Sequence, residues 1–510
     1  MTTLRLKSAI YPAIAAAVLL TGCRVGPKYH IPPAMAQAPP ISYKESPTQF
    51  KDTDGWKVAE PQDAMLHGKW WEIYNDPELN ALEDRLAIGN QNIKLAFQNF
   101  MAARAIIREA HSQLFPTAGF GPSYQRSRSS ANLKNSTGVG GSSLSAGAQS
   151  TLTSLPFDVS WQPDLWGRIR NTISQAQFEA QLSAADLENQ RLSEQANLAL
   201  FFFELRGQDA LQDLYNATIE ADKKALDIAR ARYETGIDDQ ISVVEAQNTL
   251  QNAESASANL GVARAQFEHA IAVLIGVNPS SFSVPVKPLK ATPPAIPIGM
   301  PSQLLERRPD IAASERAMAS ANAQIGIADA AFYPNLVLSA SAGLESSTFK
   351  HLFDWPSRFW SIGPSISENV FDAGLRRATV QQYTATYNAN VANYRQTVLT
   401  AFQQVEDSLA SVRILSQQIL KQQEAEQSAQ QFVDLQLARY QTGVDPYINV
   451  VTAQTTLLTD QRTLTTLRTQ AMTSSVQLIQ ALGGGWDRSQ LPTPAQVSAK
   501  PSKADTAIQR

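Results

Sequence analysis

The sequence predicts a mainly α-helical fold with membrane β-strands, built as two structural repeats in one chain. Three observations predict it. The second half of the chain repeats the first at a constant offset, two long segments contain no proline, and four short segments alternate between apolar and polar residues. These patterns indicate, in turn, a duplication, very long helices, and strands that have one face in lipid.

The composition narrows the class of protein. The 510 residues carry a net charge of −3 without a long run of either sign, so the basic face that nucleic-acid binding requires is not evident. Apolar residues make up 43% of the chain, and many are alanines, which favour helices but bury little area each. The single cysteine, Cys23, excludes an internal disulfide. We therefore expect long, closely packed helices and no nucleic-acid partner.

The first 22 residues have the character of a signal peptide. Arg5 and Lys7 precede the apolar stretch Ala9–Leu20, which is too short for a comfortable membrane-spanning helix. The sequence Leu20-Thr21-Gly22-Cys23 resembles the bacterial lipobox, where cleavage leaves a lipidated N-terminal cysteine. Residues 1–22 are therefore predicted to be removed.

Cys23 is then predicted to carry a covalent lipid as the anchor of the mature chain, with no other cofactor and no metal. The alternative is a cytoplasmic chain with a buried free cysteine. Arg24 follows the cysteine, whereas an aspartate there would resemble the inner-membrane retention signal of bacterial lipoproteins. The outer membrane is therefore the expected location.

The segments outside the two repeats are predicted to be irregular. Residues 23–62 form the lipidated tether and residues 277–302 the linker between repeats, and each segment contains seven prolines. The polar tail, residues 484–510, is expected to be flexible. Thr137–Gly147 is rich in glycine and serine and predicts a flexible loop between two strands.

The duplication is visible around two tight turns. Thirteen of twenty positions are identical between Ala231–Leu250 and Ala438–Leu457, at an offset of 207 residues (438 − 231). The same offset pairs Gly167 with Gly374, so about 110 residues align without a gap. We assign residues 63–276 to the first repeat and residues 303–483 to the second.

Each repeat is predicted to contain a helix, two strands, a very long helix and a returning helix. The first helices are expected at Pro77–Leu114 and Ser302–Ala331, each ended by a following proline. The long helices, Arg168–Arg232 and Leu375–Arg439, would each measure roughly 98 Å at 1.5 Å per residue. Such rods must pack lengthwise on neighbours in the manner of coiled coils.

Four alternating segments predict the strands, at about residues 115–127, 155–164, 333–346 and 359–371. Four strands cannot close a membrane barrel, because the smallest known barrels have eight. An open sheet in lipid would leave two edges of unpaired backbone groups, at a cost of tens of kcal/mol. Strands from several copies must therefore complete one barrel, unless the segments form ordinary hairpins of a soluble protein.

Two other classes of function compete with a channel. The sequence contains no HExxH, Gly-x-Ser-x-Gly, P-loop or cysteine–histidine nucleophile motif, so an enzyme is not expected. A structural coiled-coil lipoprotein without a pore would explain the helices, but it would leave the alternating strands unexplained.

Several dispersed motifs resemble the TolC and OprM kind of outer-membrane efflux protein, in particular its lipoprotein branch. The resemblance covers nearly the whole mature chain. The motifs are CRVGPKYHIP at Cys23, WWEIYNDPELNAL at Trp70, DLWGRIR at Asp164, RRPDIAASERAMASANAQIGIADAAFYPNL at Arg307, and both ARYxTG turns.

This resemblance implies a homotrimer with four strands per protomer in a twelve-stranded outer-membrane β-barrel, continued by a periplasmic α-helical barrel. It further implies a periplasmic adaptor protein and an inner-membrane transporter of the resistance-nodulation-division class as partners, with outer-membrane lipid around the barrel. The implied function is the exit duct of a tripartite efflux pump for drugs or other small solutes. The alternative is an exit duct for type I protein secretion, which is built on the same fold.

A conduit needs a gate at its inner end, where each long helix turns into the returning helix. Gly236 and Gly443 suit the left-handed conformation that stops a helix, and Asp238 and Asp445 then lie near the starts of the returning helices, where a negative charge is favourable. A plain turn with a cap would explain these residues equally well.

The resemblance places the periplasmic gate and the adaptor contact at this end. Relatives often carry an acid where Thr452 stands, whereas here the acid is at the matching first-repeat position, Glu245, so the resemblance does not extend to an acidic ring from the second repeat. The candidate gate residues are Arg232, Tyr233, Gly236, Asp238, Glu245, Arg439, Tyr440, Gly443, Asp445, Asn449 and Thr452.

Overall fold

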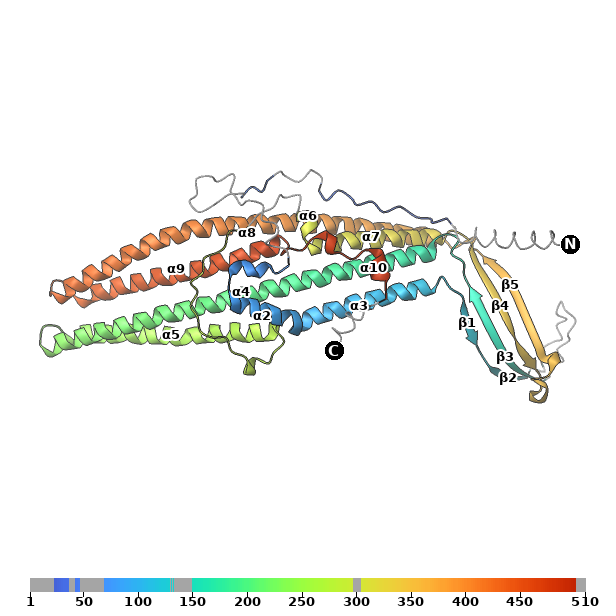
Figure 1. The fold of residues 1–510 in the computed structure, drawn as a ribbon, viewed down its shortest axis with the longest axis horizontal. Helices are drawn as coiled ribbons and strands as arrows, with labels where there is room; N and C mark the ends of the chain where they lie inside the picture. Colours follow the sequence, from blue (N-terminus) through green and yellow to red (C-terminus); the bar gives the residue numbers. More distant parts are fainter. Residues whose placement is uncertain are drawn as a thin grey trace.

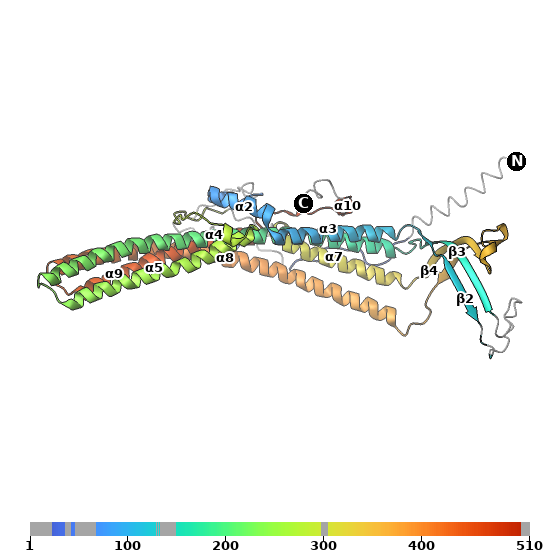
Figure 2. The same cartoon turned by 90° about the horizontal axis from the view of Figure 1, so that it is seen from below.

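The computed structural model describes residues 23–35, 42–45, 68–128, 130, 132, 149–296 and 304–500. The predicted signal peptide and the predicted loop Thr137–Gly147 lie outside these residues. The molecule is a long bundle of helical rods with a β-sheet at one end (Figure 1). Figure 2, turned by 90°, shows that the sheet is bent away from the axis of the rods.

Two helical hairpins form the part of the bundle that lies farthest from the sheet. Each has a long helix of 67 residues and a returning helix of 35 residues: α4 (Arg168–Glu234) with α5 (Gln240–Leu274), and α8 (Leu375–Gln441) with α9 (Tyr447–Ala481). At 1.5 Å per residue, each long helix measures roughly 100 Å. None of the helices in the described ranges is both long enough and apolar enough to cross a lipid bilayer.

The helix predicted over Pro77–Leu114 is two helices, α2 (Pro77–Gly89) and α3 (Gln91–Ser112). The break is at Asn90, whose side chain accepts from the Ile93 amide at 2.9 Å and donates to the Leu274 carbonyl at 2.9 Å. Gly89 lies against the backbone of residue 275 so closely that a Cβ would collide with it. The end of α5 therefore bends the chain where the local sequence predicts an uninterrupted helix.

The helix predicted over Ser302–Ala331 is also divided, into α6 (Leu304–Arg307) and α7 (Pro309–Ala330). Pro309 occupies the first turn of α7, a position where its missing N–H costs nothing. The Arg308 guanidinium donates to the Ala481 carbonyl at 3.0 Å and to Gln404 at 2.8 Å, which fixes the break against α8 and α9.

Small side chains let the rods approach one another closely. Ala180, Ala196 and Ala199 on α4 are fully buried. A Cβ on Gly207 would lie 2.5 Å from the Thr469 hydroxyl of α9, so only glycine allows this crossing of α4 and α9. The main aromatic core lies at mid-length, where the 3₁₀ turn η2 (Trp70–Tyr74) and α2 pack on α4.

The sheet is antiparallel, with the order β1/β2–β3–β4–β5. The strand predicted at about 115–127 is interrupted near Pro122, which cannot donate to the ladder, but both of its parts pair with β3 in one continuous register. The strand predicted from residue 155 begins six residues earlier. The strands are β1 (Thr117–Phe120), β2 (Ser123–Arg128), β3 (Gln149–Trp161), β4 (Asn335–Ser346) and β5 (Arg358–Ser367).

The register gathers the apolar residues on one face. Directly paired residues share a face, and Phe120, Phe157, Ala342 and Trp360 form one such row across the sheet. The next row on the opposite face is polar, with Asp158 and serines opposite one another. Within the described residues, the outer edges of β1/β2 and of β5 have no strand partner.

The described parts of the segments predicted to be irregular lie against the rods. The described parts of the tether, residues 23–35 and 42–45, contain no helix or strand, and Tyr43 is buried in an apolar cluster with residues of α7 and α8. Instead of remaining loose, the C-terminal segment forms the short helix α10 (Pro494–Ser498), whose Val497 is buried against α3 and α4. Arg104 donates to the Val497 carbonyl at 3.3 Å.

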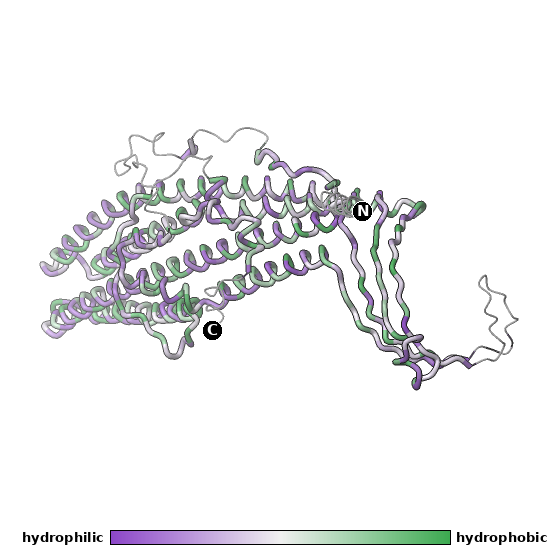
Figure 3. The backbone as a smooth tube through the Cα atoms, turned by 45° about the vertical axis from the view of Figure 1, so that its right-hand side comes forward, coloured by the Kyte–Doolittle hydropathy of each residue, from purple (hydrophilic) through white to green (hydrophobic). Residues whose placement is uncertain are grey.

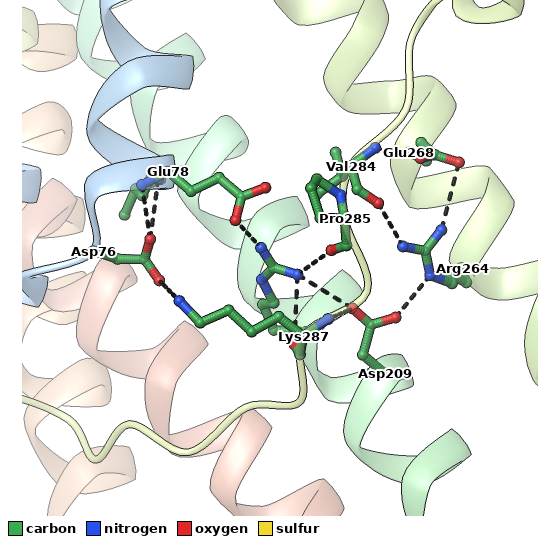
Figure 4. Close-up of polar contacts among 10 residues, drawn as sticks. Asp76, Glu78, Asp209, Arg264, Glu268, Val284, Pro285 and Lys287 are labelled. Carbon is green, nitrogen blue, oxygen red and sulfur yellow. Dashed lines mark hydrogen bonds and ion pairs between the residues drawn. The ribbon is translucent and has the colours of Figure 1, made fainter.

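The linker between the repeats is fastened by a charged cluster at mid-length (Figure 4). The fully buried Asp209 carboxylate accepts from Arg264 Nε at 2.7 Å and from the Lys287 amide at 2.9 Å, and it forms an ion pair with Arg206. Arg206 also donates to the Pro285 carbonyl at 2.6 Å and pairs with Glu78 of α2. This cluster joins α2, α4, α5 and the linker.

We expect Asp209→Ala to destabilise the mid-length region by about 1.5–3 kcal/mol, because it removes the buried carboxylate that joins both arginines to the linker and leaves Arg206 with Glu78 and Arg264 with Glu268 alone. The melting temperature should fall, and trypsin should cleave faster after Lys287 and Lys290. Asp84→Ala is the control, because its ion pair with Lys69 is exposed, and it should cost less than about 1 kcal/mol. An Asp209→Ala protein as stable and as resistant as its control would contradict this account of the linker.

Candidate functional site at the helical tips

The candidate site comprises two turns at the end of the bundle farthest from the sheet (Figure 1). The first tip, residues 235–239, joins α4 to α5, and the second tip, residues 442–446, joins α8 to α9. Gly236 and Gly443 have φ angles of 74° and 79°, in the left-handed region that favours glycine. Both glycines lie at the positions that the sequence predicts.

The second tip is closed within itself. Arg439 forms a two-pronged ion pair with Asp445, at 2.5 and 2.9 Å. The hydrogen bond and charge of Arg439 lower the pKa of Asp445, with help from the side chain of Asn449. A two-pronged arginine–carboxylate contact fixes geometry as well as charge. The Asp445 carboxylate is therefore bound within its own turn.

The first tip reaches across to the second. Asp238 accepts a hydrogen bond from the Tyr440 hydroxyl at 2.7 Å, and Arg232 lies 3.7 Å from the same carboxylate. Arg232 also donates to the Gln441 carbonyl at 3.0 Å and lies over the Tyr440 ring at 4.7 Å. These contacts fasten one helical hairpin to the other.

The charge on Asp238 is supported by its neighbours. Partial burial opposes ionisation, but hydrogen bonds from Tyr440, the Asp239 amide and Ser242, together with the charge of Arg232, lower the pKa of Asp238. Burial and the bond to Asp238 raise the pKa of the Tyr440 phenol. The contact is therefore a neutral phenol that donates to a carboxylate, which is a strong class of hydrogen bond.

An apolar cluster lies directly behind these polar contacts. Tyr440 is only 1% exposed and packs edge-on against Tyr447 at 5.1 Å between ring centroids. The rest of the buried cluster comes from α4, α5 and α9: Ala225, Leu226, Ala229, Ala246 and Val450.

Three candidate residues lie outside these contacts. Tyr233 occupies the position in the first repeat that matches Tyr440, but it is 46% exposed, and its hydroxyl has no hydrogen-bond partner among the described residues. Glu245 is half-buried, and Thr452 is exposed and donates to Ile448 of its own helix. Their roles at a gate remain predictions.

One residue that the sequence did not single out is Asp222 of α4. It is 4% exposed, its Oδ2 atom has no hydrogen-bond partner in the described part of the chain, and burial raises its pKa to about 6. It lies three, four and seven residues before the buried Ala225, Leu226 and Ala229. This helical spacing places an acid on the apolar face, and it is the signal that would have found Asp222.

Long helical rods that end in a sheet with two free edges and one apolar face define a channel protein whose membrane barrel is completed by further copies. The chain belongs to the outer membrane efflux protein family, whose family model matches residues 82–277 and 300–484.

Three similar proteins illustrate the relationship. The chain is 31% identical over 486 residues to the probable efflux pump outer membrane protein TtgC of Pseudomonas putida strain KT2440, covering 94% of this chain and 96% of that protein. The antibiotic efflux pump outer membrane protein ArpC of Pseudomonas putida matches to the same extent. The solved outer-membrane channel OprN superposes with a TM-score of 0.80 at 26% identity, covering 91% of this chain and all of that one.

The family fold completes the barrel. Channels of this fold are trimers, so three copies of the four-stranded unit, with β1 and β2 counted as one interrupted strand, make a twelve-stranded barrel. The protein is an outer-membrane efflux channel that extends into the periplasm. The predictions of fold class, family and outer-membrane location are thereby confirmed.

Tyr440→Phe tests the contact between the tips. Loss of a hydroxyl that donates to a carboxylate should weaken the contact by about 1.5–3 kcal/mol and raise the conductance of the purified channel in planar bilayers. The matched control is Tyr233→Phe, because this tyrosine occupies the equivalent repeat position but contacts neither carboxylate. Equal conductance of native, Tyr233→Phe and Tyr440→Phe channels would show that the bond does not restrict the pore.

Asp222 predicts a pH dependence of the tips. Its pKa is raised from 3.8 to about 6, so the folded tip favours the neutral acid. The free energy of unfolding of the tip is therefore highest below about pH 4 and declines as the pH rises through about 6. Asp222→Asn should remove that decline, on the order of 1–3 kcal/mol, as measured by hydrogen exchange of α4 and α5 between pH 4 and 8. Asp227→Asn, at an exposed position of the same helix, serves as the control. A native-like pH profile in Asp222→Asn would contradict the prediction.

Proposed function

We propose that the channel is the passive exit duct of a tripartite pump for drugs or other small solutes. It would receive its cargo through a periplasmic adaptor from an inner-membrane transporter of the resistance-nodulation-division class. The observation that carries the proposal is the position of two helical tips at the opposite end of roughly 100 Å rods from the sheet. Relatives named as antibiotic and probable efflux pump proteins support this class of cargo.

The tips would act as the gate of this duct. Each protomer contributes one contact of Arg232 and Asp238 with Tyr440, and separation of the two hairpins requires the loss of these bonds. The adaptor would supply the free energy of opening by binding the open tips better than the closed ones. No catalytic step is needed, because flow follows the gradient that the transporter creates.

Cys23 is proposed to carry the lipid. It is exposed, and its carbonyl accepts from Arg170 at 3.1 Å near the junction of the strands with α4. Arg24 donates to Asn171 at 2.6 Å and packs against Gly167, where a Cβ would lie 2.9 Å from the Arg24 Cα. These contacts would place an acyl group at the periplasmic rim of the barrel, within reach of the inner leaflet.

A substitution at the second tip tests the docking role. In Gly443→Leu the leucine backbone must adopt a positive φ, with its side chain beside Arg232, at a cost of about 1–3 kcal/mol. Pump-dependent resistance in cells should therefore fall, while trimeric barrels still assemble. Gly236→Leu should act in the same direction at the first tip.

The control is Gly443→Asn, because asparagine tolerates the left-handed conformation, and it should retain most of the resistance. Assembly is measured by native electrophoresis, and pore formation by conductance in planar bilayers. Unchanged resistance in Gly443→Leu would count against docking at the tips, and a trimer without conductance would overturn the duct itself.

A further inference from the structure

Three arginines lie toward the outer end of the apolar face of the sheet, on its two edge strands. In a strand, residues two apart share a face. Arg126 and Arg128 of β2 are therefore on the same face as Phe120, because the register with β3 continues unbroken past Pro122. Arg358 of β5 is on that face too, two residues before Trp360. All three side chains are exposed.

Among the described residues, none of these arginines contacts a carboxylate. The only polar side-chain contact of the three within the described residues is the hydrogen bond that Arg126 donates to Gln149 at 3.1 Å. Residues 117–157 contain no aspartate or glutamate at all. In the second hairpin Glu345 is on the opposite face, since it pairs with Ser154 and not with a residue of the apolar rows.

The other acid of the second hairpin, Asp354, contacts a histidine of the same loop. Asp354 contacts His351 at 2.7 Å. Among the described residues, the outer part of the apolar face therefore carries three arginines that have no ion-pair partner on that face.

Aromatic side chains surround the charges. The Arg358 guanidinium lies 3.4 Å from the ring centroid of Trp355, and Tyr124 and Trp360 are exposed on the apolar face. Aromatic girdles mark the interfaces of membrane barrels, where lipid head groups meet the acyl region. The hairpin ends of the strands point away from the rods, as the tube in Figure 3 also shows, so this interface is the outer one.

Closure of the barrel places arginines of two protomers on the same seam. Arg126 and Arg128 are on one edge strand of the sheet and Arg358 is on the other. In the trimer, β5 of one copy meets β1/β2 of the next copy at a seam. Each seam therefore combines Arg358 from one protomer with Arg126 and Arg128 from its neighbour.

We propose that each seam is a binding site for the phosphate groups of the phosphorylated glycolipid (lipid A) in the outer leaflet of the membrane. Guanidinium groups match phosphate oxygens in pairs, and basic clusters beside an acyl region hold lipid head groups. The apolar rows below the arginines accept the acyl chains. The proposal rests on the trimeric barrel and its orientation, and it is independent of the gate at the tips.

The test uses the purified full-length trimer in detergent, with three lipid probes: bisphosphorylated lipid A, the same lipid after removal of its phosphates, and phosphatidylglycerol. We expect the native trimer to bind bisphosphorylated lipid A about tenfold more tightly than either other probe. Raising the salt to about 1 M should reduce that preference, because screening weakens exposed charge pairs. Equal binding of the three probes, or tighter binding of phosphatidylglycerol, would overturn the proposal without any variant.

Variants test the composition of the seam. Arg358→Gln alone and the pair Arg126→Gln with Arg128→Gln should each lower the preference for phosphate, and the triple variant should abolish it. The matched control removes three exposed charges from helical pairs on the rods, Arg191→Gln, Lys223→Gln and Lys421→Gln, and should bind lipid A as the native trimer does. A triple variant that assembles and keeps the preference would refute the site. Its conductance, measured in parallel, shows separately whether the duct is intact.

Discussion

The backbone groups along the two free edges of the sheet impose the constraint on which the remaining architecture depends. In lipid, each unpaired N–H or carbonyl costs several kcal/mol, so the edges of β1/β2 and β5 must be paired by other copies. Within one protomer, β3 of the first repeat pairs with β4 of the second over nine residues. The duplication therefore supplies two hairpins that join each other, and three copies supply the closure.

Closure of the sheet also dictates how the rods are arranged. Because α4 follows β3 and α8 follows β5, each strand pair delivers one long helix to the same rim, and three copies place six such helices around one axis. Alanines and Gly207 allow the rods to pack closely. The Asp209 cluster joins α2, α5 and the linker to α4 at mid-length.

The sequence was sufficient for features that repeat or alternate, and insufficient for features set by contacts over long distances in the chain. The long helices, both glycine turns and the alternating strands follow from local patterns. The break at Asn90 depends on the Leu274 carbonyl, and the break at Arg308 depends on Ala481, so neither was predictable from its own segment. The helix in the tail was not predictable either, because Val497 packs on the distant helices α3 and α4. At the tips, the repeat alignment treats Tyr233 and Tyr440 as equivalent, but only Tyr440 is buried.

The difference between the tips has a local chemical origin. At the offset of 207, Asp239 of the first tip corresponds to Pro446 of the second. Asp239 caps α5 by accepting from the Ser242 amide, which leaves Asp238 free to accept from Tyr440 of the other hairpin. Pro446 offers no side-chain cap to α9, and Asp445 is held by Arg439 within its own turn. The duplicated turns thus differ in the partner of their matching carboxylates: the second tip binds Asp445 within its own turn, and in the first tip Asp238 accepts from the Tyr440 hydroxyl of the other hairpin.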